Sequence, residues 1–440
     1  MQASVSNLSA EDRERILTQS MAHFRNPSGS DLLQRTERFY GFIQSRAQHG
    51  LWPYSRALEA ATGPRTTISD ISEARREGLN FASQDYLGLC QHPSVIDAGI
   101  EAMHRYGAHS AGSGVLLGNT RLSLDLEQRL GEFLHMPHVT LYPTGWAAGY
   151  GAIAALVRPR DHIVMDYLSH ACLQQGAQAA TPQIAQFKHN DIADLRAKLS
   201  EIRAKDVRNG VMVITESLFS MDSDTPDVLA IQDTCREFEA TLLVDVAHDL
   251  GAMGPGGGGA LAAQNLSGKV DLVMGSFSKT FASNGGFLAS QSPAIKQFAK
   301  YFGNPHMFSN ALSPVQAAVV LKAVEIVRSA EGETLRQRLL KSVGALRQDF
   351  LSHGISCYGS PSPIVPVPFH NDRLARLCSR HIAEQNVFVN LVEYPAVPVG
   401  EARLRMQVMA THSPEQACDA VRRIMLARHE AEKDLSKWMT

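Results

Sequence analysis

The sequence predicts an α/β protein built around a mainly parallel β-sheet. Short apolar runs recur along the middle of the chain, and they lack the polar alternation of strands that face water on one side. Longer stretches of helical pattern separate several of these runs, and strands that alternate with helices form parallel sheets. Such sheets gather functional residues just past the carboxyl ends of their strands. The predicted strands are residues 139–142, 162–165, 211–215, 242–246 and 272–274.

The regions on either side of these strands predict a three-part division of the chain. Ser9 and Asp12 resemble a capping box at the start of a polar helix, with Asp in place of the usual Glu, and residues 32–48 form a second helical pattern. Beyond about Ser329 the chain becomes more helical and charged, and then rich in proline. We therefore expect an N-terminal arm that packs on the rest of the chain (1–75), a large α/β domain (76–328) and a smaller α+β domain (329–440).

Composition and charge exclude several classes of function. A hydrophobic content of 44% and a charged content of 20% are ordinary for a globular protein. The net charge of −2 provides no basic field for nucleic acid or an anionic membrane. No run reaches the roughly 20 apolar residues of a membrane helix, and the first residues lack a signal-peptide pattern. The six cysteines are isolated, which disfavours zinc and redox motifs. We expect a cytoplasmic protein with no metal site and no membrane span.

The residues that follow the apolar runs carry the chemistry. Lys279, Asp245 and His170 each come shortly after a run, and Thr144-Gly145-Trp146 opens an apolar helix after another. A carbonyl cofactor that also carries a phosphate needs such a set. Lys279 can form an imine, Asp245 can hold a pyridine nitrogen protonated, and His170 can lie flat on a ring. Backbone N–H groups at the helix start can bind a phosphate.

Each of these residues alone has an ordinary structural role. A lysine after a strand is usually a solvated charge, and an aspartate at a strand end is often a helix cap. A histidine is more often a hydrogen-bonded structural residue. The glycine-rich residues 107–118 do not fit a dinucleotide site, because no strand leads into them and their spacing is not G-x-G-x-x-G. It is the ordered set that favours a cofactor site.

With these motifs in their order and spacing, the sequence resembles the α-oxoamine synthases, which belong to the fold-type I group of pyridoxal-5′-phosphate (PLP) enzymes. The resemblance spans about Leu79 to His412. It implies a large domain with a mainly parallel seven-stranded sheet and a smaller α+β C-terminal domain. The matching segments are Asn80-Phe81-Ala82-Ser83-Gln84-Asp85-Tyr86-Leu87-Gly88-Leu89, Thr144-Gly145-Trp146-Ala147-Ala148, Asp166-Tyr167-Leu168-Ser169-His170-Ala171, His189-Asn190-Asp191, Thr215-Glu216-Ser217-Leu218-Phe219-Ser220-Met221-Asp222, Val244-Asp245-Val246-Ala247-His248, Ser276-Phe277-Ser278-Lys279 and Gly400-Glu401-Ala402-Arg403-Leu404-Arg405.

The resemblance implies a role for each matching residue. Lys279 would hold PLP as a Schiff base, Asp245 would pair with the ring nitrogen, and His170 would stack on the ring. Arg405 would grip the carboxylate of the amino-acid substrate, with Arg403 as a second candidate. A homodimer with shared active sites is also implied, in which Ser309 and Asn310 reach the phosphate of the neighbouring subunit. The remaining cofactor-binding residues would be Thr144, Gly145, Trp146, Glu216, Ser220, His248, Ser276 and Ser278.

The family reaction is a decarboxylative condensation of a small amino acid with an acyl thioester, which gives an α-amino ketone, carbon dioxide and a free thiol. The acyl carrier would be coenzyme A or an acyl carrier protein. Lys279 would act as the general base once the substrate displaces it. His170 would also polarise the thioester carbonyl.

The sequence departs from the family pattern at positions near the substrate. Gln84 stands where the family usually has Asn, and the usual Arg and His are absent at Gly114 and Ser123. Glu393 falls where the biotin-pathway synthase has an arginine, and a carboxylate there would repel an acidic acyl tail. We therefore predict a lipid-type or secondary-metabolite synthase that uses alanine, serine or another small amino acid.

Two other functions compete with this prediction. One is a different PLP reaction on the same scaffold, such as decarboxylation or transamination, which would need no acyl thioester. The other is a non-catalytic partner subunit of a synthase complex. Family members of that kind lack the Schiff-base lysine, whereas Lys279, Asp245 and His170 are all present here.

Overall fold

A computed structural model describes residues 8–439, and these residues form two compact units. The sheet unit contains Gln84–Ser220 and Asp224–Gln337. The terminal unit joins the N-terminal segment up to Ser83 with Met221–Ser223 and with the chain from Arg338 onward. This division differs from the three-part prediction, because the N-terminal arm and the C-terminal region share one unit. The unit boundaries also fall about eight residues later than predicted on each side of the sheet.

The sheet unit is built on seven strands in the order β4-β10-β9-β8-β7-β5-β6. Only β10 runs antiparallel to its neighbours, so the predicted fold class, a mainly parallel sheet in an α/β fold, is confirmed. The five predicted strands are all present, and β6 and β10 are additional. The strands are β4 (His138–Tyr142), β5 (His162–Asp166), β6 (Ile184–Phe187), β7 (Val211–Glu216), β8 (Thr241–Asp245), β9 (Leu272–Ser276) and β10 (Gly286–Ser290).

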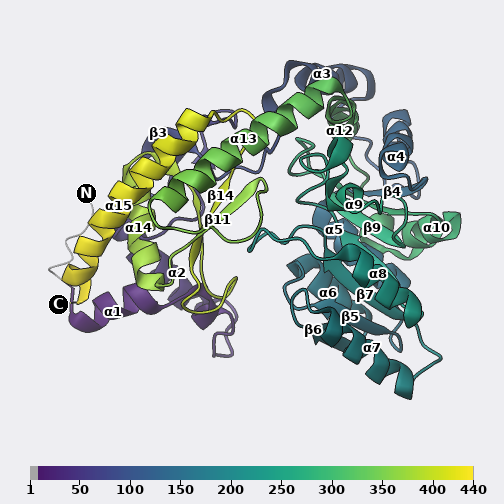
Figure 1. Cartoon of the computed structure of the whole chain (residues 1–440), viewed down its shortest axis with the longest axis horizontal. Helices are drawn as coiled ribbons and strands as arrows, with labels where there is room; N and C mark the ends of the chain where they lie inside the picture. Colours follow the sequence, from purple (N-terminus) through teal and green to yellow (C-terminus); the bar gives the residue numbers. More distant parts are fainter. Residues whose placement is uncertain (1–7, 440) are drawn as a thin grey trace. The chain divides into compact units, whose positions relative to one another are not determined.

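Helices connect and surround these strands (Figure 1). Most begin at a polar side chain that accepts the first free N–H groups, as Asp191, Asp227 and Ser313 do. The helices of this unit are α3 (Pro93–Tyr106), α4 (Arg121–Leu134), α5 (Gly145–Leu156), α6 (Ala171–Ala180), α7 (Ile192–Lys205), α8 (Val228–Glu237), α9 (Gly259–Ala263), α10 (Pro293–Phe302), α11 (Asn304–Met307) and α12 (Pro314–Val327), with 3₁₀ turns at Leu89–Gln91 and Pro255–Gly257. Helix α13 (Ala330–Ser352) continues from this unit into the terminal unit.

The terminal unit contains two small sheets. The first has the order β1-β2-β3-β12, and the second has the order β11-β14-β13. The parallel pairing of β3 with β12 explains why the N-terminal segment belongs with the C-terminal region, since Leu79 donates its N–H to the Asn386 carbonyl at 2.9 Å. The strands are β1 (Ala57–Leu58), β2 (Arg65–Ser69), β3 (Arg75–Asn80), β11 (Ile364–Pro368), β12 (Val387–Phe388), β13 (Asn390–Val392) and β14 (Arg403–Gln407).

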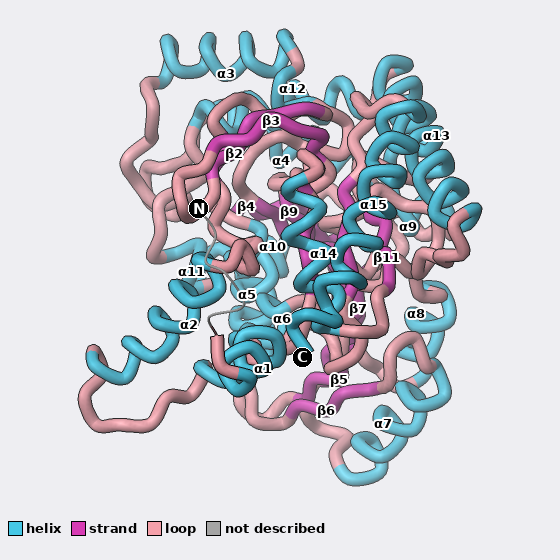
Figure 2. Tube along the Cα trace, turned by 90° about the vertical axis from the view of Figure 1, so that its left-hand side faces the viewer, coloured by secondary structure: helices cyan, strands magenta, loops and turns pink. Residues whose placement is uncertain are grey.

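Helices from both ends of the chain pack on these sheets. Helix α15 (Pro414–Met439) runs beside α14 (Asp372–Glu384), and α1 (Ala10–Thr18) lies near the end of α15 (Figures 1 and 2). The predicted cap at Ser9 is present, because its Oγ accepts the Asp12 N–H at 3.1 Å. The second N-terminal helix, α2 (Glu37–Gln48), begins later than predicted, after 3₁₀ turns at Met21–Phe24 and Gln34–Thr36. Within residues 8–439, no helix is long and apolar enough to cross a membrane.

Candidate functional site

A cavity of about 300 Å³ lies in the sheet unit, at the carboxyl ends of its central strands. This is the edge at which parallel sheets bind their ligands, and the volume is at the lower end of the range for small-molecule sites. Ten of the cofactor-binding residues predicted from the sequence line it. They are Thr144, Gly145, Trp146, His170, Glu216, Asp245, His248, Ser276, Ser278 and Lys279.

Part of the cavity wall has the groups that suit a phosphate. The Thr144 hydroxyl caps α5 by accepting the Ala147 N–H at 3.0 Å, which leaves the first amides of the helix directed outward. The Ser276 and Ser278 hydroxyls lie 2.7 Å apart beside this helix start. A Cβ at Gly145 would collide with the Ser276 side chain, so the close approach of the two segments requires a glycine.

Two buried carboxylates also line the cavity. Glu216 and Asp245 end the neighbouring strands β7 and β8, where they pair directly in the parallel register. Asp245 is held in place because its Oδ1 accepts the Ala247 N–H at 2.9 Å. Burial raises the pKa of Asp245, and the positive charges of His170 and Lys279 oppose that increase. A cationic group beside this buried carboxylate is favourable, and a protonated ring nitrogen would provide one.

His170 begins α6 and lies in the cavity wall beside Trp146. Its backbone N–H donates to Glu216 Oε1 at 2.5 Å, and its Nδ1 accepts the Cys172 N–H at 3.3 Å. The Trp146 and His170 rings meet edge to face, with their centroids 6.1 Å apart. These contacts fix both the backbone and the imidazole ring of His170.

Lys279 lies on a short turn after β9, and Phe277 anchors this turn in the core. Phe277 is fully buried, its ring stacks on Phe287 at 5.7 Å, and its N–H donates to the Gly285 carbonyl at 2.9 Å. This anchor holds the backbone on which Lys279 extends into the cavity. His248 is oriented similarly, since its Nδ1 lies 2.8 Å from the hydroxyl of the buried Tyr86.

These residues fit PLP. The helix start and the serine pair suit its phosphate, the buried Asp245 suits its ring nitrogen, and Lys279 provides the amine for its aldehyde. Because Gly145 has no Cβ, the start of α5 can lie close to the Ser276 side chain. The cavity lining thus contains groups that suit the phosphate, the ring nitrogen and the aldehyde of this cofactor.

A charged network beneath the His170 turn stabilises the same edge of the sheet. The His189 ring lies between two carboxylates, with Nδ1 3.0 Å from both Asp166 oxygens and Nε2 2.7 Å from Asp224 Oδ2. Asp166 also accepts the Leu168 N–H at 2.9 Å, so it fixes the turn that leads to His170. Burial alone would lower the pKa of His189, but the hydrogen bonds and charges of the two carboxylates raise it to about 10.

We expect His189 to make stability depend on pH. Its pKa is about 6.5 in an unfolded chain and about 10 in the folded one. Its contribution is therefore fully present below about pH 6.5, decreases as the pH rises, and is lost above about pH 10. Urea unfolding should show that His189→Gln lowers the free energy of unfolding more near pH 6 than near pH 10. His104→Gln, at an exposed position, is the control; an equal loss from His189→Gln at both pH values would contradict this account.

Three predicted cofactor residues do not line the cavity. Ser220 lies where the chain leaves the sheet unit for the terminal unit. The Ser309 hydroxyl donates to the Pro305 carbonyl, and Asn310 forms a β-bridge with Ser113. A role for Ser309 and Asn310 toward a neighbouring subunit remains a prediction.

The predicted substrate residues are divided between the two units, with Gln84 at the start of the sheet unit and Arg403 and Arg405 on β14 of the terminal unit. Arg403 is buried and pairs with Asp222, and its Nη1 also donates to the Met221 carbonyl at 3.1 Å. Arg405 is half-buried, and its Nη1 lies 3.9 Å from the Met221 sulfur. The guanidinium of Arg403 is therefore committed to a carboxylate of this chain.

Glu393 is placed differently from the sequence prediction. Its carboxylate is buried in the terminal unit, where Oε2 accepts Arg376 Nε at 2.5 Å and Oε1 accepts Arg46 Nη1 at 3.3 Å. The same two guanidiniums donate to carbonyls at the end of α1, those of Ile16, Leu17 and Gln19. Two guanidinium cations balance the charge of Glu393. The carboxylate therefore has no free charge with which to repel an acidic acyl tail, which is the effect that we expected from the sequence.

The cavity also contains residues that the sequence did not identify, namely Cys172, Ala247, Met274, Asn284 and Gly285. The Cys172 sulfur lies 3.0 Å from His170 Nδ1. Burial, followed by the charges of Asp245 and Glu216, raises the pKa of the Cys172 thiol far above its usual value, so the thiol stays neutral. The sequence could have indicated that Cys172 lies in this site, because a side chain two residues after His170 can reach back to the imidazole ring.

Comparison with known proteins agrees with this geometry. Residues 76–424 match the family model for class I and II aminotransferases. The chain is 33% identical to the serine palmitoyltransferase of Sphingobacterium spiritivorum over 92% of this chain and 98% of that protein. It is 34% identical to the 8-amino-7-oxononanoate synthase of Pectobacterium atrosepticum over 81% of this chain and 89% of that protein.

Solved structures give the same result. The serine palmitoyltransferase of Sphingomonas wittichii superposes with a TM-score of 0.85 at 26% identity, covering 92% of this chain and 99% of that one. A serine palmitoyltransferase structure from S. paucimobilis with bound PLP also gives a TM-score of 0.85 at 26% identity, covering 91% of this chain and 99% of that one. Because the family match spans most of the chain and the cavity fits the cofactor, the chain belongs to the α-oxoamine synthases, the PLP-dependent acyltransferases of the class I and II aminotransferase family.

Proposed function

We propose that this α-oxoamine synthase condenses a small amino acid, with serine the first candidate, with a long-chain acyl thioester. The reaction forms a bond between the α-carbon of the amino acid and the thioester carbonyl, and it releases carbon dioxide and the thiol. The observation that carries the choice of substrates is the extent of the match. The serine palmitoyltransferase of Sphingobacterium spiritivorum aligns over 405 residues, whereas the 8-amino-7-oxononanoate synthase of Pectobacterium atrosepticum aligns over 357.

The chain's own residues divide the work of this reaction. PLP, when bound, supplies a ring that withdraws electrons from the α-carbon of the substrate. The Asp245 carboxylate holds a proton at the ring nitrogen, and burial of this carboxylate strengthens that interaction. The start of α5 and the Ser276–Ser278 pair bind the phosphate and fix the orientation of the ring. The Lys279 amine removes the proton from the α-carbon, and His170 orients the acyl carbonyl for attack.

We expect Arg405, rather than Arg403, to bind the carboxylate of the amino acid. The family resemblance assigns this role first to Arg405, and the guanidinium of Arg403 is already paired with Asp222. Arg405→Lys should raise the KM for the amino acid about tenfold or more, because a lysine cannot make the two parallel hydrogen bonds of a guanidinium. Arg403→Lys should lower thermal stability and leave this KM nearly unchanged. Steady-state kinetics and thermal unfolding of both variants separate these roles, and a KM effect confined to Arg403→Lys would contradict the assignment.

We also propose that the enzyme is a homodimer whose subunits share active sites. Large apolar side chains of the sheet unit are exposed in a single chain, with Leu116, Leu117 and Phe308 each at least 80% accessible. Phe308 immediately precedes Ser309 and Asn310, which the family resemblance assigns to the neighbouring site. Light scattering should give about twice the 48.0 kDa mass of the chain.

The six cysteines are all free thiols, which supports a cytoplasmic location.

The decisive experiment measures carbon dioxide release from carboxyl-labelled glycine, alanine and serine, each with and without palmitoyl-CoA. Release that requires the acyl-CoA, and is fastest with serine, would support the proposal. Release without any acyl-CoA would instead indicate a decarboxylase. A preference for pimeloyl-CoA over palmitoyl-CoA would refute the lipid-type assignment. A chain that binds no PLP and releases nothing would be a non-catalytic subunit. An acyl carrier protein thioester in place of the CoA thioester tests the identity of the carrier.

A further inference from the structure

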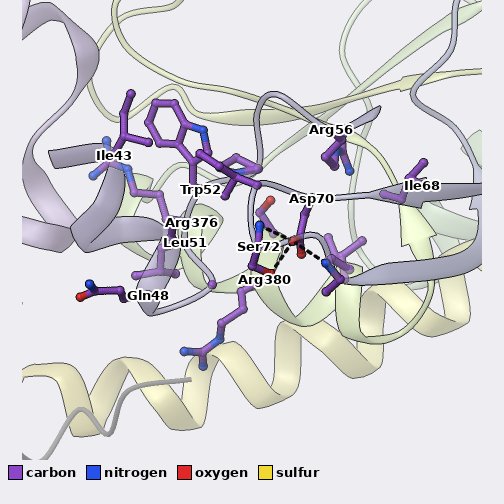
Figure 3. A pocket seen from close by; sticks show the side chains of 18 of the residues that line it. Ile43, Gln48, Leu51, Trp52, Arg56, Ile68, Asp70, Ser72, Arg376 and Arg380 are labelled. Atoms are coloured by element: carbon purple, nitrogen blue, oxygen red, sulfur yellow. Dashed lines mark hydrogen bonds between the residues drawn. The ribbon is translucent and has the colours of Figure 1, made fainter. Parts of the chain in front are cut away.

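A second and larger cavity lies in the terminal unit, apart from the residues that bind PLP. Its volume is about 540 Å³, well within the range of small-molecule sites. Its walls come from α2, from the irregular segment that follows α2, from the hairpin of β2 and β3, and from α14. Figure 3 shows Leu51, Trp52 and Arg376 along one side of this cavity and Arg56, Ile68 and Asp70 along the other.

Much of the cavity wall is apolar. Leu51, Trp52 and Ile68 are each at most 8% accessible, so they form a fixed lining rather than mobile surface groups. Apolar side chains from three further segments complete the wall. These are Ile43 and Ala47 of α2, Ile382 and Ala383 of α14, and Val387 and Val389. A water-filled cavity with such walls gains free energy when an apolar chain displaces the water.

The charged groups that line the cavity are mostly cationic. Four arginines and one aspartate contribute to the wall. Arg376 is paired with Glu393, which it shares with Arg46, and Arg380 is paired with Asp434. Arg76 has only a long contact of 3.9 Å with Asp70. Among the described residues, Arg56 has no carboxylate within ion-pair distance.

Arg56 is held in place and keeps donors available. Its Nη2 donates to the Val389 carbonyl at 2.8 Å and to Asn390 Oδ1 at 3.5 Å. Its Nε and Nη1 make no hydrogen bond within residues 8–439. Burial lowers the pKa of Arg56 and no acidic group opposes that change, so the cation is partly desolvated without compensation. An anionic ligand would supply the missing partner.

Asp70 does not supply that partner. Its Oδ1 accepts hydrogen bonds from the Ser72 N–H at 2.8 Å, the Ser72 hydroxyl at 2.6 Å and the Ala74 N–H at 3.4 Å. Burial alone would raise the pKa of Asp70, but these hydrogen bonds outweigh burial and lower it. The carboxylate is thus engaged in holding the turn between β2 and β3, and the cavity retains one unmatched positive charge.

We propose that this cavity binds a medium- or long-chain aliphatic carboxylate. The carboxylate group pairs with Arg56, assisted by Arg76, and the chain lies along Leu51, Trp52 and Ile68. One unmatched guanidinium calls for one negative charge, and the apolar walls call for an aliphatic body. The site is separate from the cofactor cavity, and the inference does not depend on which amino acid the enzyme uses.

The test is calorimetric titration of the purified, PLP-loaded enzyme with dodecanoate below its micelle concentration, without amino acid or acyl-CoA. We expect one dodecanoate per chain. Arg56→Gln should weaken binding at least about tenfold, because a charge-assisted hydrogen bond is lost. Arg75→Gln is the matched control, since Arg75 neighbours Arg76 on β3, is 73% exposed and does not line the cavity. Absence of binding, or equal affinities in Arg56→Gln and Arg75→Gln, would overturn the proposal.

Four further measurements test whether dodecanoate occupies this cavity and whether its charge is recognised. Ala383→Leu keeps every charge but fills the cavity, so it should abolish binding while thermal unfolding shows an intact fold. Lys279→Ala should bind dodecanoate as tightly as the unaltered enzyme, and a loss of binding there would place the ligand in the cofactor cavity and overturn the inference. Dodecyltrimethylammonium should not bind, and dodecyl phosphate should not bind more tightly than dodecanoate. Because binding is measured without turnover, failure of this proposal is distinct from failure of the proposed reaction.

Discussion

Replacing Lys279 with alanine is expected to lower acyl-dependent carbon dioxide release at least about a thousandfold. The amine of Lys279 reaches the cavity from the turn that Phe277 anchors, and no other lysine of residues 8–439 lines that cavity. On the proposed mechanism, removing it would delete both the group that attaches the cofactor and the base that takes the α-proton. Lys279→Arg should be nearly as slow, because a guanidinium stays protonated at any working pH.

The measurement is release of labelled carbon dioxide from the best amino acid, with each variant saturated in PLP. Lys269→Ala is the matched control, because Lys269 is an exposed lysine of the same unit. Its rate should equal that of the unaltered enzyme. If the rate of Lys279→Ala were within tenfold of the control rate, Lys279 would not be the catalytic base. Another group would then have to remove the α-proton.

Replacing Glu393 with alanine is expected to have the largest effect on stability, about 3–5 kcal/mol. Its carboxylate lies between the guanidiniums of Arg46 and Arg376, and all three side chains are at most 3% accessible. Burial lowers the pKa of Arg46 to about 10, although the charge of Glu393 opposes that change. Without Glu393, two buried cations would face each other with no counter-charge.

Urea unfolding of Glu393→Ala and Glu393→Gln measures this effect. The glutamine variant keeps the shape of the side chain and loses only the charge, so it shows how much of the loss is electrostatic. Glu430→Ala is the control, since Glu430 forms an exposed pair with Lys433 and its removal should change little. A loss in Glu393→Ala no greater than that in Glu430→Ala would mean that the cluster is not stabilising.

The sequence was sufficient to predict the strands that are buried on both faces. Residues such as Val211–Glu216 are apolar over most of their length, and that pattern depends only on local chemistry. The two additional strands carry weaker signals. Strand β6 is a four-residue edge strand with only Phe187 buried, and β10 contains Gly286 and small residues that are also common in turns.

That Lys279, Asp245 and Thr144 line one cavity was predictable for a related reason. These three residues each lie at or just after the end of a strand, so chain order alone places them at one edge of the sheet. The environment of Glu393 was not predictable, because its partner Arg46 lies 347 residues away in the chain. No local pattern indicates that two distant charges are buried together, so the sequence alone pointed this carboxylate toward the substrate.

The joining of both chain ends in the terminal unit has a consequence for biosynthesis. Arg376 donates a hydrogen bond to a carbonyl at the end of α1, and β3 pairs with β12, which begins at Val387. Both partners come much later in the chain than the segments that they contact. A ribosome adds about 5–20 residues per second, so the first 83 residues wait tens of seconds before these partners emerge. During that interval the nascent N-terminal helices have incomplete packing, whereas the sheet unit already has nearly all of its residues. The sheet unit should therefore be completed first, and the terminal unit should close only after Arg376 and Val387 have been made, which makes the early helices the stretch on which a molecular chaperone would act.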